Sequence, residues 1–141
     1  MKRSPIQRKT PLRASQVRMK SRHSTGKPTT AEAQRIYALA HSRCLACTMN
    51  KTALGNQLWI APFEGSDVHH LLSGGTRRGH SDTVALCPWH HRGVAPNGLS
   101  VANATAFYGP SLARNPRGFH EFYGTDADLL ALQNRMLREN A

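Results

Sequence analysis

Two stretches, Val68-His69-His70 and Leu86-Cys87-Pro88-Trp89-His90-His91-Arg92-Gly93, each carry a pair of adjacent histidines, and the pairs stand about twenty residues apart. A loop rich in glycine and arginine, residues 73–81, joins them. Neighbouring residues point to opposite faces of a strand and about 100° apart on a helix, so the two members of each pair serve different purposes. The pattern indicates metal binding.

The three cysteines belong to a pattern typical of structural zinc. Cys44 and Cys47 form a CxxC motif, and Cys87 and His90 form a CxxH motif about forty residues later. Together they provide the four ligands of a closed tetrahedral zinc site, although CxxC alone is equally typical of a redox pair, and separately buried cysteines are the other alternative. We expect His90 and not His91 to be the fourth zinc ligand, because CxxH repeats the ligand spacing of CxxC.

Length and composition limit the class of protein. A chain of 141 residues with 39% hydrophobic residues accommodates one domain with a modest core, which a bound metal commonly supports. No apolar run approaches the eighteen or so residues of a membrane span, and the charged N-terminus does not read as a secretory signal, so a cytoplasmic protein is expected. The net charge of +11 predicts a polyanionic partner, most simply nucleic acid.

The positive charge is concentrated in residues 1–30, which contain no Asp or Glu. Removing the nine basic residues of this segment leaves a net charge of only about +2 on the rest of the chain. We expect a disordered arm that binds phosphates independently of sequence, preceding a folded domain over residues 31–141; a merely solubilising tail is the alternative. The basic residues of the arm are Lys2, Arg3, Arg8, Lys9, Arg13, Arg18, Lys20, Arg22 and Lys27.

The local patterns predict an α+β fold. A capping box at residues 29–32 begins a short helix that ends near residue 42. Strands are expected at residues 57–61, 67–72 and 82–86, followed by a short helix with Cys87 as N-cap, Pro88 in its first turn and Gly93 at its end. The order strand, loop, strand and helix is a ββα-metal arrangement.

The C-terminal third carries weaker signals. A helix is expected at residues 99–108, a break at 115–118, and a final helix capped by residues 125–128. Phe119, Phe122 and Tyr123 are expected to pack onto the domain. The apolar face of the final helix consists of Leu129, Leu130, Leu132, Met136 and Leu137. No role is assigned to His23, His41 or His120.

The CxxC motif, then VHHLLSGG, then TVALCPWHHRG resemble the HNH endonuclease superfamily. The basic segment KRSPIQRKTPLR and the closing FHEFYGTDADLLALQNRML are similar to the phage recombination-enhancement (Ref) nucleases that act with RecA. The resemblance implies that His69 and His91 bind one catalytic divalent ion, Mg²⁺, Mn²⁺ or Zn²⁺, and that His70 is the general base. It also implies products with 5′-phosphate and 3′-hydroxyl ends.

One position departs from the superfamily pattern. Where many HNH sequences have an Asn before the LC element, this chain has Asp82, which leaves open whether Asp82 joins the catalytic site or the role passes to Thr83 or His80. His80 and Asp82 are therefore candidate metal or phosphate contacts. Asp67 shares a strand face with His69 and either orients that imidazole or faces solvent. The candidate phosphate contacts among the arginines are Arg77, Arg78 and Arg92.

The sequence thus predicts a metal-dependent DNA endonuclease with a structural zinc ion. Its expected substrate is single-stranded DNA or a D-loop, and RecA filaments are its expected partner. The expected location is the cytoplasm of a bacterial host. The alternatives are a RecA-independent phage HNH nuclease and a non-catalytic zinc module that binds nucleic acid. A plain Cys₃His module has no need of His91 beside its fourth ligand, nor of the pair His69 and His70.

Overall fold

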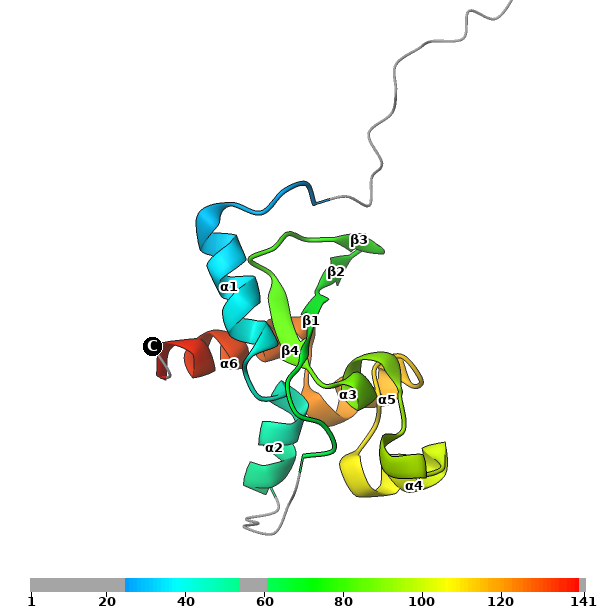
Figure 1. Cartoon of the computed structure of the whole chain (residues 1–141). Coiled ribbons are helices and arrows are strands. Elements are labelled where there is room, and N and C mark those ends of the chain that lie inside the picture. Colours follow the sequence, from blue (N-terminus) through cyan, green and yellow to red (C-terminus); the bar gives the residue numbers. More distant parts are fainter. Residues whose placement is uncertain (1–24, 54–60, 140–141) are drawn as a thin grey trace, which may run out of the picture.

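The computed structural model describes residues 25–53 and 61–139 (Figure 1). The arm residues up to Arg22 lie outside the described residues, as does the strand predicted at 57–61 except for Ala61, which is not in a strand. The helices are α1 (Thr30–Ala40), α2 (Leu45–Ala53), α3 (Pro88–Arg92), α4 (Val101–Tyr108), α5 (Pro116–Tyr123) and α6 (Asp126–Glu139), with a 3₁₀ turn at Pro96–Gly98. The strands are β1 (Asp67–His70), β2 (Leu72–Ser73), β3 (Thr76–Arg77) and β4 (Thr83–Leu86). The α+β class is confirmed.

The strands form one long antiparallel hairpin in two sections. β1 pairs with β4, which places His69 opposite Val84 and His70 opposite Thr83. Beyond this pair, β2 and β3 form a second short ladder. Gly74 and Gly75 close the tip with φ angles of 56° and 77°, a conformation that two-residue hairpin turns require and that glycine adopts without strain. The loop predicted at residues 73–81 is therefore wrong in part: Ser73 and Thr76–Arg77 belong to strands, and only Gly74 and Gly75 form the turn between them.

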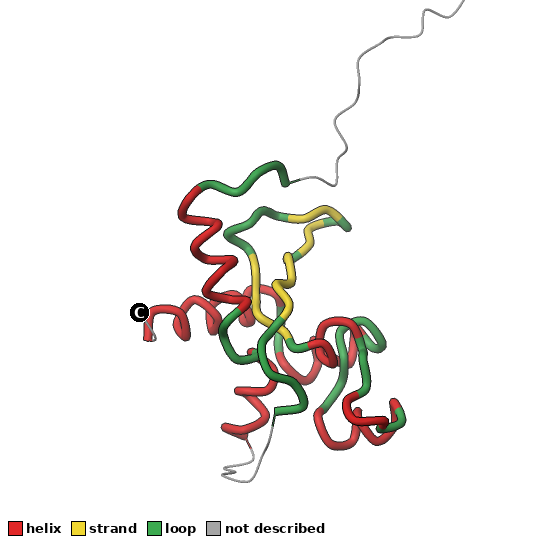
Figure 2. The backbone as a smooth tube through the Cα atoms, viewed as in Figure 1, coloured by secondary structure: helices red, strands yellow, loops and turns green. Residues whose placement is uncertain are grey.

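The core lies around β4, all of whose residues are buried. Helices α1, α2 and α6 contact this strand, and α3 packs beside it, so the strands run between helices (Figure 2). Trp89 and Phe119 are the largest fully buried side chains. A strand covered on both faces reads as a continuous apolar run, which Val84-Ala85-Leu86 provides.

Three helix starts were predicted correctly from capping residues. Thr29 and Glu32 form a reciprocal capping box at α1, and Cys87, Pro88 and Gly93 delimit α3 as expected. At α6, the Thr125 hydroxyl and the Asp128 carboxylate each accept a hydrogen bond from the other residue's backbone N–H. Side-chain acceptors satisfy the first N–H groups of α1 and α6, whereas α3 has no side-chain cap and its start is marked by Pro88 in the first turn, so all three starts are visible in the sequence.

Two predictions about the C-terminal third were wrong. The expected break at residues 115–118 begins α5, because Asn115 accepts a hydrogen bond from Gly118 N–H and Pro116 occupies the first helical position. Phe122 is 63% exposed, because α5 buries Phe119 and Tyr123, four residues apart on its opposite face. In the N-terminal half of the domain, the helix α2 that follows Cys44 was not predicted from the sequence.

Among the helices in residues 25–53 and 61–139, none combines the length and the apolar composition needed to cross a bilayer.

Candidate functional site

The four predicted zinc ligands come together in the core. Cys44 and Cys47 lie one turn apart at the start of α2, and Cys87 and His90 lie at the start of α3. Their ligand atoms all lie within 4.8 Å of one another, and all four residues are buried. Nδ1 of His90 is 3.5, 3.5 and 3.2 Å from the sulfurs of Cys44, Cys47 and Cys87.

These separations fit a tetrahedral zinc ion. Bonds of about 2.3 Å to sulfur and 2.0–2.1 Å to nitrogen place tetrahedral ligands about 3.6–3.8 Å apart, and Cys47 and Cys87 have their sulfurs 3.9 Å apart. Hydrogen bonding to Cys44 and to Cys87, together with burial, raises the pKa of the Cys47 thiol. Three sulfurs and one imidazole nitrogen in a single buried space are the ligand set of a structural zinc site, so these four residues could bind a zinc ion.

The environment of His90 fixes which ring nitrogen faces the sulfurs. Nε2 of His90 donates to the Tyr108 carbonyl at 2.9 Å and lies 3.1 Å from the Tyr123 hydroxyl. Because a carbonyl only accepts, Nε2 carries the proton and Nδ1 keeps its lone pair. A hydrogen bond of this kind on the outer nitrogen is the usual support of a metal-bound histidine.

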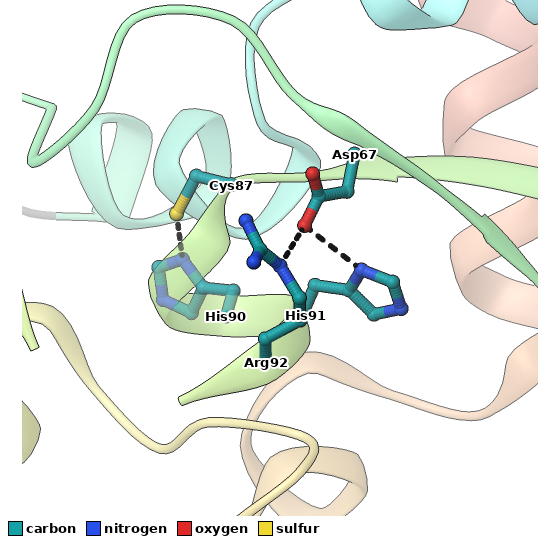
Figure 3. Close-up of polar contacts among 5 residues, drawn as sticks. All are labelled: Asp67, Cys87, His90, His91 and Arg92. Atoms are coloured by element: carbon teal, nitrogen blue, oxygen red, sulfur yellow. Dashed lines mark hydrogen bonds and ion pairs between the residues drawn. The ribbon is translucent and has the colours of Figure 1, made fainter. Parts of the chain in front are cut away.

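The second cluster lies on the other side of α3. His69 of β1 and His91 of α3 have ring centroids 4.9 Å apart in an edge-to-face arrangement. Figure 3 shows His90 and His91 pointing away from each other, His90 toward Cys87 and His91 toward Asp67. One short helix thus serves two separate clusters, as the rotation between neighbouring helix residues predicts.

Asp67 orients His91, which corrects the sequence hypothesis that it orients His69. The Asp67 carboxylate accepts hydrogen bonds from Nδ1 of His91 at 3.1 Å and from Nε of Arg92 at 2.7 Å (Figure 3). Burial opposes ionisation, yet the hydrogen bonds from Arg92 and His91 lower the pKa of the Asp67 carboxyl. The charged carboxylate holds the Nδ1 proton of His91, and Nε2 keeps its lone pair for a ligand.

His69 is suited to bind a cation. Burial, followed by the charges of His91 and His70, lowers the pKa of His69 to about 4. The imidazole is therefore neutral at ordinary pH, which is the form that ligates metals. The two rings come from distant segments of the chain and lie against each other, and the Asp67 carboxylate fixes the orientation of His91.

His70 points to the opposite face of β1 from His69. Its Nε2 lies 3.0 Å from Nδ1 of His80, in the segment between β3 and β4. Burial, and then the charges of Arg77 and His80, lower the pKa of His70. At neutral pH it is therefore an uncharged imidazole, as a proton acceptor must be.

A family model described as "Recombination enhancement, RecA-dependent nuclease" matches residues 28–138. The chain belongs to this family. The match covers the α2 cysteines, the hairpin and all later helices. No solved structure matches the chain. Membership of the RecA-dependent nuclease family indicates a nuclease that acts in recombination, and DNA as its substrate.

Of the remaining predicted site residues of this RecA-dependent nuclease, Arg77, Arg78, His80 and Asp82 lie along the hairpin and Arg92 lies at the end of α3. Asp82 forms an ion pair with Nε of Arg78 at 3.2 Å, and its carbonyl accepts the backbone N–H of Leu71. Arg77 is exposed in β3, and Arg92 is held by Asp67. The structure thus brings His70 and His80 together and pairs Asp82 with Arg78.

Two residues that position the site were missed in the sequence. Arg35 of α1 donates through Nε to the Thr83 hydroxyl at 3.1 Å and through Nη2 to the Thr83 carbonyl at 2.7 Å. Gln133 of α6 is fully buried and accepts the Ala85 backbone N–H at 2.9 Å. Gln133 had a visible signal, because it interrupts the apolar face of α6 between Leu129 and Met136; Arg35 had none.

Proposed function

We propose that this RecA-dependent nuclease is a metal-dependent DNA endonuclease of the HNH type, hydrolysing phosphodiester bonds. The observation that carries the proposal is the contact between His69 and His91, whose ring centroids are 4.9 Å apart. His70 is the next residue after His69 in β1. Phosphodiester hydrolysis needs a base for the attacking water and a cation for the charge on the phosphate and leaving oxygen. His69 and His70 are neighbours on β1 and His91 lies on α3, and the order β1, β4, α3 supports a ββα-metal arrangement.

In this proposal each histidine has its own task. His69 and His91 would hold one divalent ion, and the Asp67 carboxylate keeps Nε2 of His91 available for it. When bound, Mg²⁺, Mn²⁺ or Zn²⁺ would supply Lewis-acid stabilisation of the phosphate charge. His70 accepts a proton from water, which its lowered pKa allows at neutral pH. Whether Asp82 adds a ligand stays a prediction.

The Cys44, Cys47, Cys87 and His90 cluster would hold a structural zinc ion. It links the start of α2 to the start of α3, so it fixes the helix that carries His91. The binding free energy of such a site becomes folding free energy. The proposed zinc thus acts on catalysis only through the position of His91.

The basic residues suit a DNA substrate. We propose that the arm over residues 1–30 binds phosphates without sequence preference, ahead of the domain at 31–141, and that single-stranded DNA or a D-loop formed by RecA is cut. Arg77 at the end of β3, Arg78 directly after it and Arg92 are candidate phosphate contacts. Affinity should then fall steeply with salt.

The proposal is tested by incubating the full chain with a RecA filament paired to a supercoiled plasmid, with Mg²⁺ or Mn²⁺. We expect cleavage inside the D-loop and none without RecA. Cleavage without RecA would indicate a RecA-independent HNH nuclease. Binding of the D-loop without any cleavage would indicate a non-catalytic zinc module.

The pH dependence of cleavage should reflect His70. A base must be neutral, and burial with the charges of Arg77 and His80 lowers the pKa of His70 below its ordinary 6.5. Activity is therefore expected to persist as pH falls through 6.5 and to be lost only below it, as measured from the acid limb of kcat/KM. Arg77→Gln should move that limb to higher pH. An acid limb centred above 6.5 in the wild type would contradict the assignment.

Asp67→Asn should weaken binding of the catalytic ion. The amide cannot hold the His91 proton with a full charge, and loss of such an outer partner commonly costs about 10–100-fold in metal affinity or activity. Titration of the zinc-loaded protein with Mn²⁺ would measure the affinity for the catalytic ion. The matched control is Glu121→Gln, which also removes a carboxylate paired with an arginine but lies on the exposed face of α5. Equal Mn²⁺ affinity in both variants would contradict the role of Asp67.

A further inference from the structure

The His80 ring lies between the proposed base and the start of the described chain. Its Nδ1 is 3.0 Å from Nε2 of His70, and its Nε2 is 3.1 Å from the Gly26 carbonyl oxygen. The Thr25 hydroxyl is also 3.1 Å from Nε2. The His70 and His80 rings stand edge to face, with centroids 5.1 Å apart. His80 therefore bridges segments that lie far apart in the chain.

The backbone of His80 is fixed as well as its ring. The Thr83 hydroxyl donates to the His80 carbonyl at 2.9 Å, and Arg35 donates to the same hydroxyl at 3.1 Å. Arg35 also donates to the Asn134 side chain at 2.8 Å, which ties this network to α6. A histidine on an unsupported surface loop would have none of these constraints. His80 is thus fixed through its backbone carbonyl and through both of its ring nitrogens.

The hydrogen bonds also determine which nitrogens carry protons. A carbonyl oxygen only accepts, so the Gly26 contact requires the proton of neutral His80 on Nε2. Nδ1 of His80 is then an acceptor, and Nε2 of His70 must donate to it. Nδ1 of His70 is left with its lone pair, and it makes no hydrogen bond within the part of the chain that the structure describes. That lone pair is what a general base uses.

We infer that His80 is a positioning residue for His70: linked to the Gly26 carbonyl, it selects the Nε2–H tautomer of His70 and directs Nδ1 toward the attacking water. This inference rests on the proposed nuclease function and adds a role for His80 and for the backbone at residue 26. The root of the basic segment is then part of the catalytic machinery, in addition to any contact that the segment makes with DNA.

The tautomer of His70 tests the inference without DNA. Long-range ¹H–¹⁵N correlation spectra of the full-length, zinc-loaded protein, recorded at a pH well above the ordinary histidine pKa of about 6.5, distinguish Nδ1–H from Nε2–H imidazoles. We expect pure Nε2–H His70 in the wild type and a mixture in His80→Phe, which keeps a ring but no acceptor. An unchanged His70 tautomer in His80→Phe would overturn the inference.

Kinetics separate positioning from space filling. His80→Phe should lower kcat about 10–100-fold with KM nearly unchanged, since general-base catalysis as a whole contributes about 10²–10⁴-fold. His80→Asn, whose side-chain oxygen can accept from His70, should restore the Nε2–H tautomer and most of kcat. Equal kcat in the Phe and Asn variants would overturn the inference. A wild type that cleaves nothing would instead overturn the proposed function, and the spectra would still report on His80.

A backbone variant gives the same test without changing any side chain of the site. Gly26 has φ +77°, and nothing lies within 4 Å of the place a Cβ would take, so Gly26→Val is strained by conformation alone and should displace its carbonyl. The matched control is Gly98→Val, with φ +69° and similarly open surroundings in the 3₁₀ turn. We expect a mixed His70 tautomer only in Gly26→Val; a pure Nε2–H His70 in that variant would contradict the link to residue 26.

Discussion

Replacing His70 with alanine is expected to lower D-loop cleavage by about 10²–10⁴-fold, the usual contribution of a general base. The side chain is half-buried and is not part of the buried core around Trp89 and Phe119, so the fold should be retained. The measurement is the single-turnover rate with saturating Mn²⁺, together with the melting temperature and the zinc content. We expect the last two to match the wild type.

The matched control is His41→Ala. His41 is also a histidine whose ring hydrogen-bonds a neighbour, the Tyr37 carbonyl at 2.8 Å, but it lies at the end of α1. Its rate should equal that of the wild type. Equal rates in His70→Ala and His41→Ala would end the assignment of His70 as the base.

The second large effect is expected at the cysteine cluster. Cys44→Ser should abolish stoichiometric zinc binding and the cooperative thermal transition, because a structural zinc site contributes an apparent binding free energy of about 10–16 kcal/mol to the folded state. The modest core of this small domain does not offset such a loss. Zinc content by elemental analysis and thermal unfolding by circular dichroism are the measurements.

A control on the same helix is Thr52→Ala, which removes an exposed hydroxyl near the end of α2. It should bind one zinc ion and unfold cooperatively. Chelation should unfold the wild type in the same way as Cys44→Ser, and added Zn²⁺ should restore it. A Cys44→Ser protein that unfolds at the wild-type temperature would show that the cluster is not a structural metal site.

The parts of the fold that were predictable depend on local spacing. Ligands three residues apart lie one turn apart on a helix, so the motifs of Cys44 and Cys87 each present two ligands to one point. Caps were equally visible, because Thr29 and Asp128 satisfy backbone groups of their own helix. In each case the sequence contains both partners of the interaction within a few residues.

The parts that were missed depend on packing between distant segments. Strand alternation correctly places Asp67 and His69 on one face, but only the approach of α3 decides that Asp67 contacts His91. Arg35 donates a hydrogen bond to Thr83, which lies 48 residues away in the sequence. The contact of His80 with Gly26 likewise depends on where the chain before α1 lies. No period or motif specifies such pairs.

The most direct test of the central claim is anomalous diffraction from crystals of the zinc-loaded protein soaked in Mn²⁺. We predict two separate metal positions: zinc among Cys44, Cys47, Cys87 and His90, and manganese bound by the ring nitrogens of His69 and His91. Zinc at the cysteine cluster with no manganese at His69 and His91, and those nitrogens too far apart to share an ion, would contradict that claim.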